Sequence, residues 1–327
     1  MPSPFSGPNA NELINLFLSA PLLGAGFFRL TASGKNQIIR SMKKRPLSGK
    51  IVLGVVMLTL LGPGPGAAGE RSPLPVVRPN FEIGRSAHRG ASHYAPENTI
   101  PAYLKAVEQG YQWIEIDVRY SKDGAPVLHH DSWTLRSSLV ALPVRAMTYS
   151  RLKKLNAGIW YGPKFRDARI PSLEEALSAL SGKVNLYLDL KEPPQPELIR
   201  LLKKYGFYPD HVLVLGNQNG PKFLEFEPEA KYLAKPGSIR DIDRLLREYP
   251  SLFALNVGCQ VLTPEMVDAA HARGVLVFSN VINLMPWQTR DCMHYPILYG
   301  ADVTQIDNLR VFNEVVEEIR REQEVRP

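Results

Sequence analysis

The chain has little cysteine and no long uninterrupted apolar segment. Its 327 residues include two cysteines, Cys259 and Cys292. Two cysteines are too few for a disulfide framework, and a domain of about 250 residues can bury a sufficient core without one. The sequence leaves open whether the two pair. An apolar run at 51–61 is too short to cross a bilayer comfortably, so an uncleaved membrane anchor is the weaker interpretation.

The chain also lacks a real excess of charge of one sign. The formal net charge is +7, but residues 1–69 hold seven Lys or Arg and one Glu. The remainder then carries 32 basic and 31 acidic residues. A net charge near +1 argues against a polyanion-binding surface, and therefore against a nucleic-acid partner.

The N-terminal segment has the order of a secretory signal. A basic stretch at 42–45 precedes the apolar run, and small residues follow it up to Gly69. We expect cleavage near Gly69 and export to the periplasm or the extracellular space. Residues 1–41 show no sustained period and are interpreted as an upstream mis-start or an unstructured extension, with the true start at Met42. Residues 70–80 have the composition of a linker.

From residue 81 to 327, short β-rich runs alternate with amphipathic helical stretches, which is typical of parallel strands joined by crossover helices. Eight strands are expected, the number that closes a barrel. A doubly wound open sheet is the alternative, but no Gly-x-Gly-x-x-Gly follows the first strand. We therefore predict a (β/α)8 TIM barrel. The expected strands are 85–88, 113–118, 185–190, 211–215, 231–234, 253–257, 275–279 and 302–306, and the expected helices are 99–109, 173–180, 196–204, 239–248, 264–272 and one from 311.

A further strand-like run, 127–130, does not fit the count of eight. The turn dipeptide Asp123-Gly124 precedes it, which predicts an antiparallel β-hairpin excursion after the second strand. This excursion is expected to bring His130 over the mouth of the barrel. His129 is then expected to face the opposite side of its strand.

Three carboxylates are expected at the ends of neighbouring strands. Glu115 and Asp117 alternate with Ile116 and so share one face of the second strand, and Asp189 ends the third. Carboxylates this close repel unless a cation lies between them, and oxygen ligands favour Mg2+ or Ca2+. The alternative for Asp189 is an ion pair with Lys191.

Proton transfer and phosphate binding require other residue types. His88 and His130 are the candidate general acid and base, and the sequence does not assign which is which. It also leaves open whether water attacks directly or a substrate hydroxyl first closes a cyclic phosphate. Arg89 and Lys191 are expected to face the phosphate. The other histidines, His93, His211, His271 and His294, are interpreted as surface or structural.

The segment Pro96-Glu97-Asn98-Thr99 supports two interpretations. Asn98 or Thr99 is suited to cap the first helix. Glu97 and Asn98 are equally candidates for residues that support the metal site or Arg89.

The ordered motifs His88-Arg89-Gly90, Glu115-Ile116-Asp117 and His129-His130-Asp131 resemble those of the glycerophosphodiester phosphodiesterase family. The resemblance covers about residues 84–312. It implies a TIM barrel that uses one divalent cation to hydrolyse glycerophosphodiesters to glycerol 3-phosphate and an alcohol. The family usually has Glu where this chain has Asp189. The chain also departs from the family pattern at 215–217 and 278–281, which puts the alcohol-side contacts in doubt.

Two other functions are compatible with the same residues. A lysophospholipase D or sphingomyelinase D-like relative would act on membrane lipids and would need membrane contact. The sequence supports this weakly, through aromatic pairs such as Trp160-Tyr161. A non-catalytic phosphate-binding barrel is disfavoured because both histidines are present.

Overall fold

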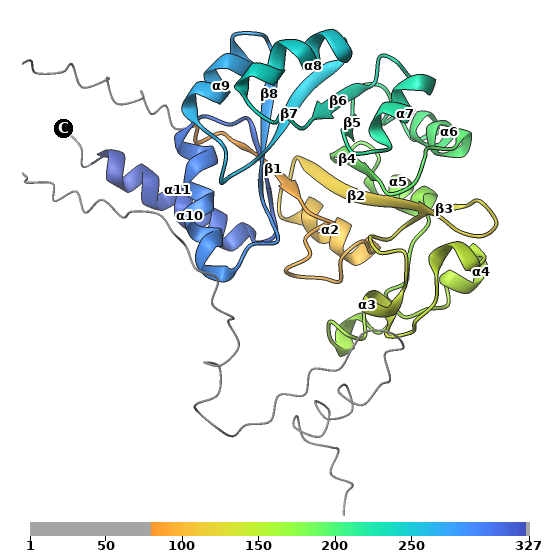
Figure 1. The fold of residues 1–327 in the computed structure, drawn as a ribbon. Coiled ribbons are helices and arrows are strands. Elements are labelled where there is room, and N and C mark those ends of the chain that lie inside the picture. Colours follow the sequence, from red (N-terminus) through yellow and green to blue (C-terminus); the bar gives the residue numbers. More distant parts are fainter. Residues whose placement is uncertain (1–79, 325–327) are drawn as a thin grey trace, which may run out of the picture. The chain divides into compact units, whose positions relative to one another are not determined.

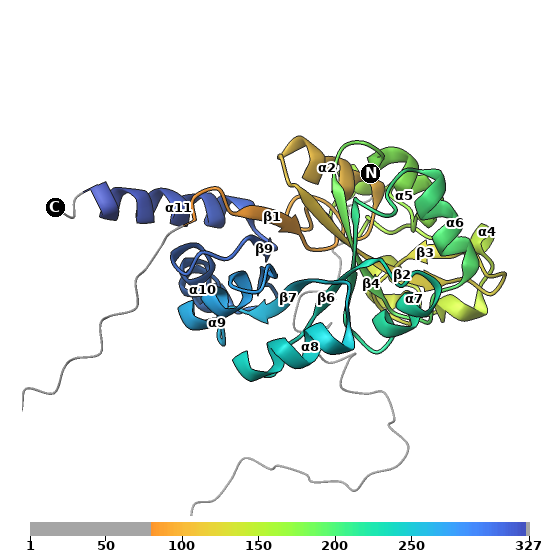
Figure 2. The same cartoon turned by 90° about the horizontal axis from the view of Figure 1, so that it is seen from above.

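The computed structural model describes residues 80–324, and the predicted extension, signal and linker lie outside them except for residue 80. Within this range eight parallel strands form a closed ring, because β1 pairs with both β2 and β9 (Figures 1 and 2). The predicted (β/α)8 barrel is confirmed. Its strands are β1 Gly84–Ala87, β2 Trp113–Tyr120, β4 Asn185–Leu190, β5 Val212–Leu215, β6 Lys231–Ala234, β7 Leu252–Gly258, β8 Leu276–Val281 and β9 Val303–Ile306.

Helices surround the ring in the alternating order that the sequence predicted. Local signals explain their starts: the Thr99 side chain caps α2, and Ser172 forms a capping box with Glu175 at the start of α5. The described helices include α2 Ile100–Glu108, α5 Leu173–Leu180, α6 Pro196–Lys204, α7 Gly220–Phe226, α8 Ile242–Glu248, α9 Pro264–His271, α10 Pro286–Leu298 and α11 Leu309–Glu324.

Two helices differ from the sequence-based expectation. The short α7 was not predicted, because it has seven residues and begins with Gly220-Pro221. The connection that runs from Asn280 to Tyr299 is only weakly helical by sequence pattern and is not among the expected helices, yet it contains the 13-residue α10 with Pro296 inside it. No described helix is long and apolar enough to cross a membrane.

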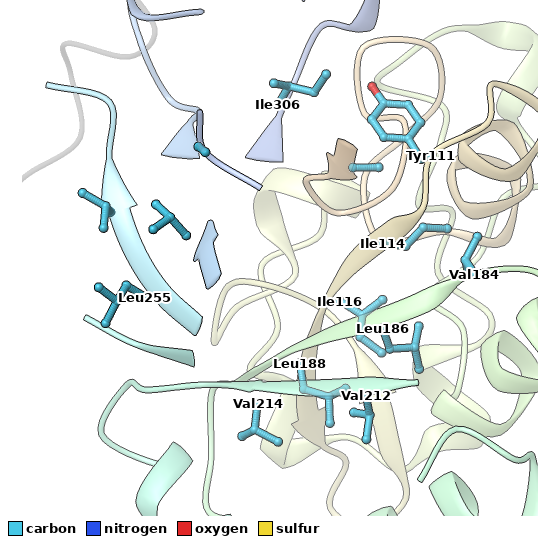
Figure 3. Packing of buried hydrophobic residues seen from close by; sticks show 14 of the residues in the cluster. Tyr111, Ile114, Ile116, Val184, Leu186, Leu188, Val212, Val214, Leu255 and Ile306 are labelled. Carbon is cyan, nitrogen blue, oxygen red and sulfur yellow. The ribbon is translucent and has the colours of Figure 1, made fainter. Parts of the chain in front are cut away.

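Strand alternation divides the core into two layers. Leu186 and Leu188 of β4 point outward into the large cluster between sheet and helices, with Ile114 and Ile116 of β2 beside them (Figure 3). Tyr187 belongs instead to a separate cluster with residues such as Phe278 of β8. The same alternation must place Asp189, two residues after Tyr187, on the inner face.

The predicted hairpin is present. β3, Pro126–Leu128, pairs antiparallel with the end of β2. After it the chain forms an excursion, residues 129–171, which we call the insertion. It contains α3 Leu135–Ser138, the 3-10 turn Val144–Ala146, α4 Tyr149–Leu152 and the 3-10 turn Pro163–Phe165. A small core of its own, separate from the main cluster, includes Val144, Met147 and Leu152. In Figure 1 α3 and α4 lie beside the barrel, on the side of β3.

The question of the two cysteines is answered by the structure. Cys259 and Cys292 form a disulfide. It ties the segment after β7 to α10, which is the helix with the weakest sequence pattern.

Candidate active site

Three carboxylates from β2 and β4 meet on one face of the sheet. One oxygen from each of Glu115, Asp117 and Asp189 lies within 4.8 Å of the other two. The strand register explains this, because Asp117 and Asp189 are direct partners across β2 and β4. Glu115 and Asp117 are almost fully buried. The set of hard oxygen donors fits a divalent cation such as Mg2+ or Ca2+.

The electrostatics of this cluster favour a bound cation. Burial, with Asp117 and Asp189 nearby, raises the pKa of Glu115 well above its ordinary value. Burial would also raise the pKa of Asp117, but Lys191 and Arg89 lower it below the ordinary value. The cluster therefore holds more negative charge than it readily accommodates without further positive charge.

Lys191 lies within the cluster. Its Nζ is 2.8 Å from Asp117 Oδ1 and 2.5 Å from Asp189 Oδ2. Burial would lower the pKa of Lys191, but the two carboxylates raise it above its ordinary value, so the ammonium stays charged. The structure thus shows the ion pair that was the alternative for Asp189, and it extends this pair to Asp117.

Neighbouring amides hold the carboxylates in position. Asn98 Nδ2 donates to Asp117 Oδ2 at 2.7 Å, and Asn217 Nδ2 donates to Asp189 Oδ1 at the same distance. The backbone N–H of Arg89 donates to Glu115 Oε2 at 2.8 Å. Asn217 had been noticed only as a departure from the family pattern. Its role depends on the β4–β5 pairing, which local sequence does not reveal.

The loop after β1 has an unusual backbone. Arg89 and Asn98 have φ of 57° and 52°, in the left-handed region that non-glycine residues rarely adopt. Gly90 has φ +82°, and a Cβ there would lie 2.9 Å from the backbone of Ala102. This conformation aims the Arg89 amide at Glu115 and the Asn98 side chain at Asp117. Strained backbone of this kind clusters at functional sites.

His88 is held by a carboxylate from the opposite end of the chain. Its Nδ1 lies 2.7 Å from Oδ1 of Asp307, just after β9. Partial burial would raise the pKa of Asp307, but the hydrogen bond and charge of His88 keep it below its ordinary value. A carboxylate on Nδ1 places the other ring nitrogen, Nε2, as the one free to exchange a proton. Sequence reasoning missed Asp307, because its proximity to His88 arises only when β9 closes the ring against β1.

His130 lies at the start of a chain of ion pairs. Its Nδ1 is 2.6 Å from Asp131 Oδ1, and Asp131 Oδ2 accepts from Arg136 Nε at 2.6 Å. Arg136 then binds both oxygens of Glu97 at 2.7 and 2.8 Å, and Glu97 accepts from Arg89 at 3.2 Å. The chain of contacts therefore connects His130 of the insertion to Arg89 of the barrel. Arg136 was not identified from the sequence.

The two predicted supporting residues, Glu97 and Asn98, each contact a candidate site residue. Glu97 touches Arg89, and Asn98 touches Asp117, so both lie one contact away from the candidate phosphate and metal groups. Arg89 Nε also lies 3.3 Å from Asp117 Oδ2. Its guanidinium is thus shared between Glu97 and the carboxylate cluster. Thr99, and not Asn98, is the cap of α2.

The remaining histidines lie elsewhere. His129 is buried in the insertion, with Nε2 2.7 Å from Ser137 Oγ, and burial lowers its pKa. Its Nδ1 lies 2.7 Å from the backbone carbonyl oxygen of Asp131, so both ring nitrogens are engaged within the insertion. His211 contacts Asn185, His271 contacts Asp302, and His93 lies edge-on to Tyr94. His294 contacts the Arg290 carbonyl and lies 3.9 Å from Glu318.

Comparison with known proteins identifies the family. Residues 88–286 match the model of the glycerophosphoryl diester phosphodiesterase family. The chain belongs to this family. Over 230 residues it is 31% identical to the glycerophosphodiester phosphodiesterase of Caldanaerobacter subterraneus, covering 66% of this chain and 90% of that one. It is 33% identical over 180 residues to human glycerophosphodiester phosphodiesterase 1, covering 54% of this chain and 52% of the human one.

A solved structure supports the same assignment. The phosphodiesterase of Oleispira antarctica, in complex with the product sn-glycerol-3-phosphate, is 26% identical to this chain with a TM-score of 0.61. The match covers 72% of this chain and 96% of that one. The chain spans about half the length of several other curated relatives, including a Bacillus subtilis one. Membership places the chain among phosphodiester hydrolases.

Proposed function

We propose that the protein is an exported, divalent-cation-dependent glycerophosphodiester phosphodiesterase. Its products would be glycerol 3-phosphate and an alcohol. One observation carries the proposal: three converging carboxylates share a barrel mouth with two histidines, each bound through Nδ1 to a carboxylate of its own. The product bound to the Oleispira relative supports the glycerol 3-phosphate half of the substrate.

The candidate site residues have two kinds of role: some bind the cation or the phosphate, and others transfer protons. Glu115, Asp117 and Asp189 would hold Mg2+ or Ca2+, which when bound offsets negative charge on the phosphodiester. Arg89 and Lys191 supply fixed positive charge beside it, where charge grows in the transition state.

The histidines complete the reaction. One imidazole accepts the proton of the attacking group as the new P–O bond forms; this group is either water, or a substrate hydroxyl that closes a cyclic phosphate which water then opens in a second step to give glycerol 3-phosphate. The other imidazole donates a proton to the leaving alcohol oxygen as the old P–O bond breaks. His88 and His130 fill these two roles, because Asp307 and Asp131 keep both Nε2 atoms available. Arrangements of this kind stabilise the imidazolium that forms.

Assays of the full chain would test this proposal. Protein stripped with chelator should lose turnover of glycerophosphocholine and regain it with Mg2+ or Ca2+. Full activity in excess chelator, with no metal recovered from the protein, would contradict the metal role. Released glycerol 3-phosphate distinguishes this cleavage from one that leaves phosphate on the alcohol.

A second candidate function acts on larger lipids. It is favoured by exposed apolar side chains in the insertion, among them Trp133 and Leu139. A lysophospholipase D or sphingomyelinase D-like activity would use the same site. Comparing glycerophosphocholine with lysophosphatidylcholine in one assay separates the two, because only the second substrate carries an acyl chain.

Export is proposed from the leader pattern of residues 42–69, and the Cys259–Cys292 disulfide supports it. Disulfides persist in oxidising compartments and are rare in the cytosol. N-terminal sequencing of the protein from its native host should find a start near Glu70. A chain that still begins with Met1 would contradict the proposal.

A further inference from the structure

The insertion, residues 129–171, carries an unusual share of the exposed apolar surface. It makes up less than a fifth of the described chain, yet it holds half of the twelve exposed large hydrophobic residues recorded there. Scattered single residues of this kind are ordinary, but a concentration in one short segment indicates an interaction surface. The six are Trp133, Leu135, Leu139, Val140, Ile159 and Trp160, exposed by 39–63%.

The same segment carries an excess of positive charge. It contains eight of the 32 basic residues after position 69 but only two of the 31 acidic ones, Asp131 and Asp167. The rest of that region is therefore acidic, with 24 basic and 29 acidic residues. The near-zero overall charge hides this asymmetry.

Several of these basic side chains form no ion pair within the described residues. Within residues 80–324, no salt bridge is recorded for Arg151, Lys154 or Lys164, and all three are exposed. Others of the eight are paired, such as Lys153 with Glu175. The exposed cations and the exposed apolar side chains thus belong to one segment of the chain.

Topology places this segment on the catalytic face. The insertion lies within the connection from β2 to α5, and such connections line the mouth of a barrel. Its first residues include His130 and Asp131. Figure 1 shows α3 and α4 on the side of the barrel where β3 lies.

We propose that the insertion is a docking surface for an anionic lipid bilayer. Interfacial segments combine aromatic and aliphatic side chains, which enter the headgroup region, with basic side chains, which are attracted to anionic lipids. The exposed apolar side chains of Leu139, Val140 and Ile159 would bury little surface against a nucleic acid, so this partner fits less well. The charge of the insertion, set against an acidic remainder, would orient the barrel with its mouth toward the membrane. This inference goes beyond the proposed catalytic function and does not depend on it.

Vesicle binding by the full-length protein tests the charge component. Vesicles of phosphatidylglycerol and phosphatidylcholine should bind it, and pure phosphatidylcholine vesicles should bind much less. The double variant Arg151→Gln/Lys154→Gln should weaken binding to the anionic vesicles by about tenfold or more. The control Lys183→Gln/Arg247→Gln removes the same charge from exposed positions just after α5 and near the C-terminal end of α8, and it should bind like the wild type. Equal loss in both double variants would overturn the proposal.

The apolar component has its own matched pair. Trp133→Ser removes a side chain exposed by 53%, and Phe226→Ser removes one exposed by 49% at the end of α7. Only Trp133→Ser should weaken binding, by about fivefold. Because the leader could also contact lipid, brominated-lipid quenching of tryptophan fluorescence gives a local readout: Trp133→Ser should lower the quenched emission, and Trp160 should account for quenching that remains. Unchanged quenching in this variant would overturn the proposal.

A different occupant of the surface would also be recognised. If the insertion instead pairs with a second copy of the chain, gel filtration without lipid would show a concentration-dependent dimer that Trp133→Ser abolishes. That result would overturn lipid docking. A monomer in solution that binds anionic vesicles through the insertion would support it.

Discussion

The barrel and the insertion contribute to the candidate site in different ways. The barrel strands provide the carboxylates Glu115, Asp117 and Asp189, which are fixed by hydrogen-bonded register and, for Glu115 and Asp117, by deep burial. The insertion provides His130, whose partner Asp131 has a side chain exposed by 33%. The barrel half thus gains its geometry from the sheet, whereas the insertion half depends on a few ion pairs near the surface.

The two histidines show the same contrast. His88 is bound to Asp307 at the seam where the barrel closes. His130 is bound to Asp131, which depends in turn on Arg136 and Glu97. We therefore expect substitutions in the barrel half to remove chemistry outright, and substitutions in the insertion network to misplace a group that remains present.

Replacing the histidines should have the largest effect. General acid and base catalysis each contribute about a hundredfold to ten-thousandfold. We expect His88→Ala and His130→Ala each to lower kcat by at least about a hundredfold. The double variant should lose much less than the product of the two, because the groups act as a unit. Steady-state kinetics with thermal unfolding would measure this.

His129→Ala is the control for the histidine pair. It should affect catalysis far less, since its ring binds Ser137 inside the insertion. An essential His129 with a dispensable His130 would mean that the acid–base pair has been assigned wrongly.

Asp117→Asn should weaken metal binding by at least about tenfold. It removes one charged oxygen from a site with three protein carboxylates. The amide would also face Lys191 and Arg89 without a charge to offset them. Titration calorimetry with Mg2+ and Ca2+ measures the loss. Asp167→Asn, at an exposed carboxylate of the insertion, should bind metal like the wild type.

Arg136→Gln should have a smaller effect of a different kind. Arg136 touches Asp131 and Glu97, so it acts on catalysis by positioning His130 and Arg89. We expect kcat to fall by about tenfold, and the pH–rate profile to shift, with metal affinity retained. Arg136→Lys should restore little, because one ammonium cannot bind both carboxylates as the fork does. Arg145→Gln, exposed by 69% and paired with Glu192, is the matched control. An unchanged pH profile would contradict the positioning role.

The sequence predicted the barrel half well because its signals are local. Alternation along 113–118 and 185–190 gave both the strands and the inward carboxylates, and capping residues gave α2 and α5. Long-range contacts were not accessible. Asn217 and Asp307 acquire their roles only through strand pairing and ring closure.

The insertion was harder to predict, apart from the turn at Asp123-Gly124 that located its hairpin. Its helices have three or four residues, which is too short for a periodic signal. Arg136 therefore had no distinguishing pattern, although its contacts join His130 to Glu97.

The pH dependence of stability gives the smallest effect, and it compares the two histidine partners directly. For both Asp307 and Asp131, burial would raise the pKa, but hydrogen bonds hold it below the ordinary value of about 3.9. A carboxyl group whose pKa is lower in the folded than in the unfolded state stabilises the fold. This stabilisation is fully present above the unfolded-state pKa and is lost as the pH falls through the folded-state pKa.

These two carboxylates have different partners. Asp131 has the permanently charged Arg136 as a partner in addition to His130, whereas Asp307 is paired with His88 and accepts from the backbone N–H of Asn283. The substitution Asp131→Asn should therefore reduce the free energy of unfolding at pH 7.5 more than Asp307→Asn does. Both losses should be below about 1 kcal/mol, because each side chain is a third or more exposed and solvent screens its charge. As the pH falls from about 4 toward the lowered folded-state pKa values of the two carboxyl groups, both costs should shrink. Urea unfolding at pH 7.5 and at about pH 3 measures the differences. Equal costs at pH 7.5 would show that His88 and His130 are held in the same way, and the contrast between barrel and insertion would then be wrong.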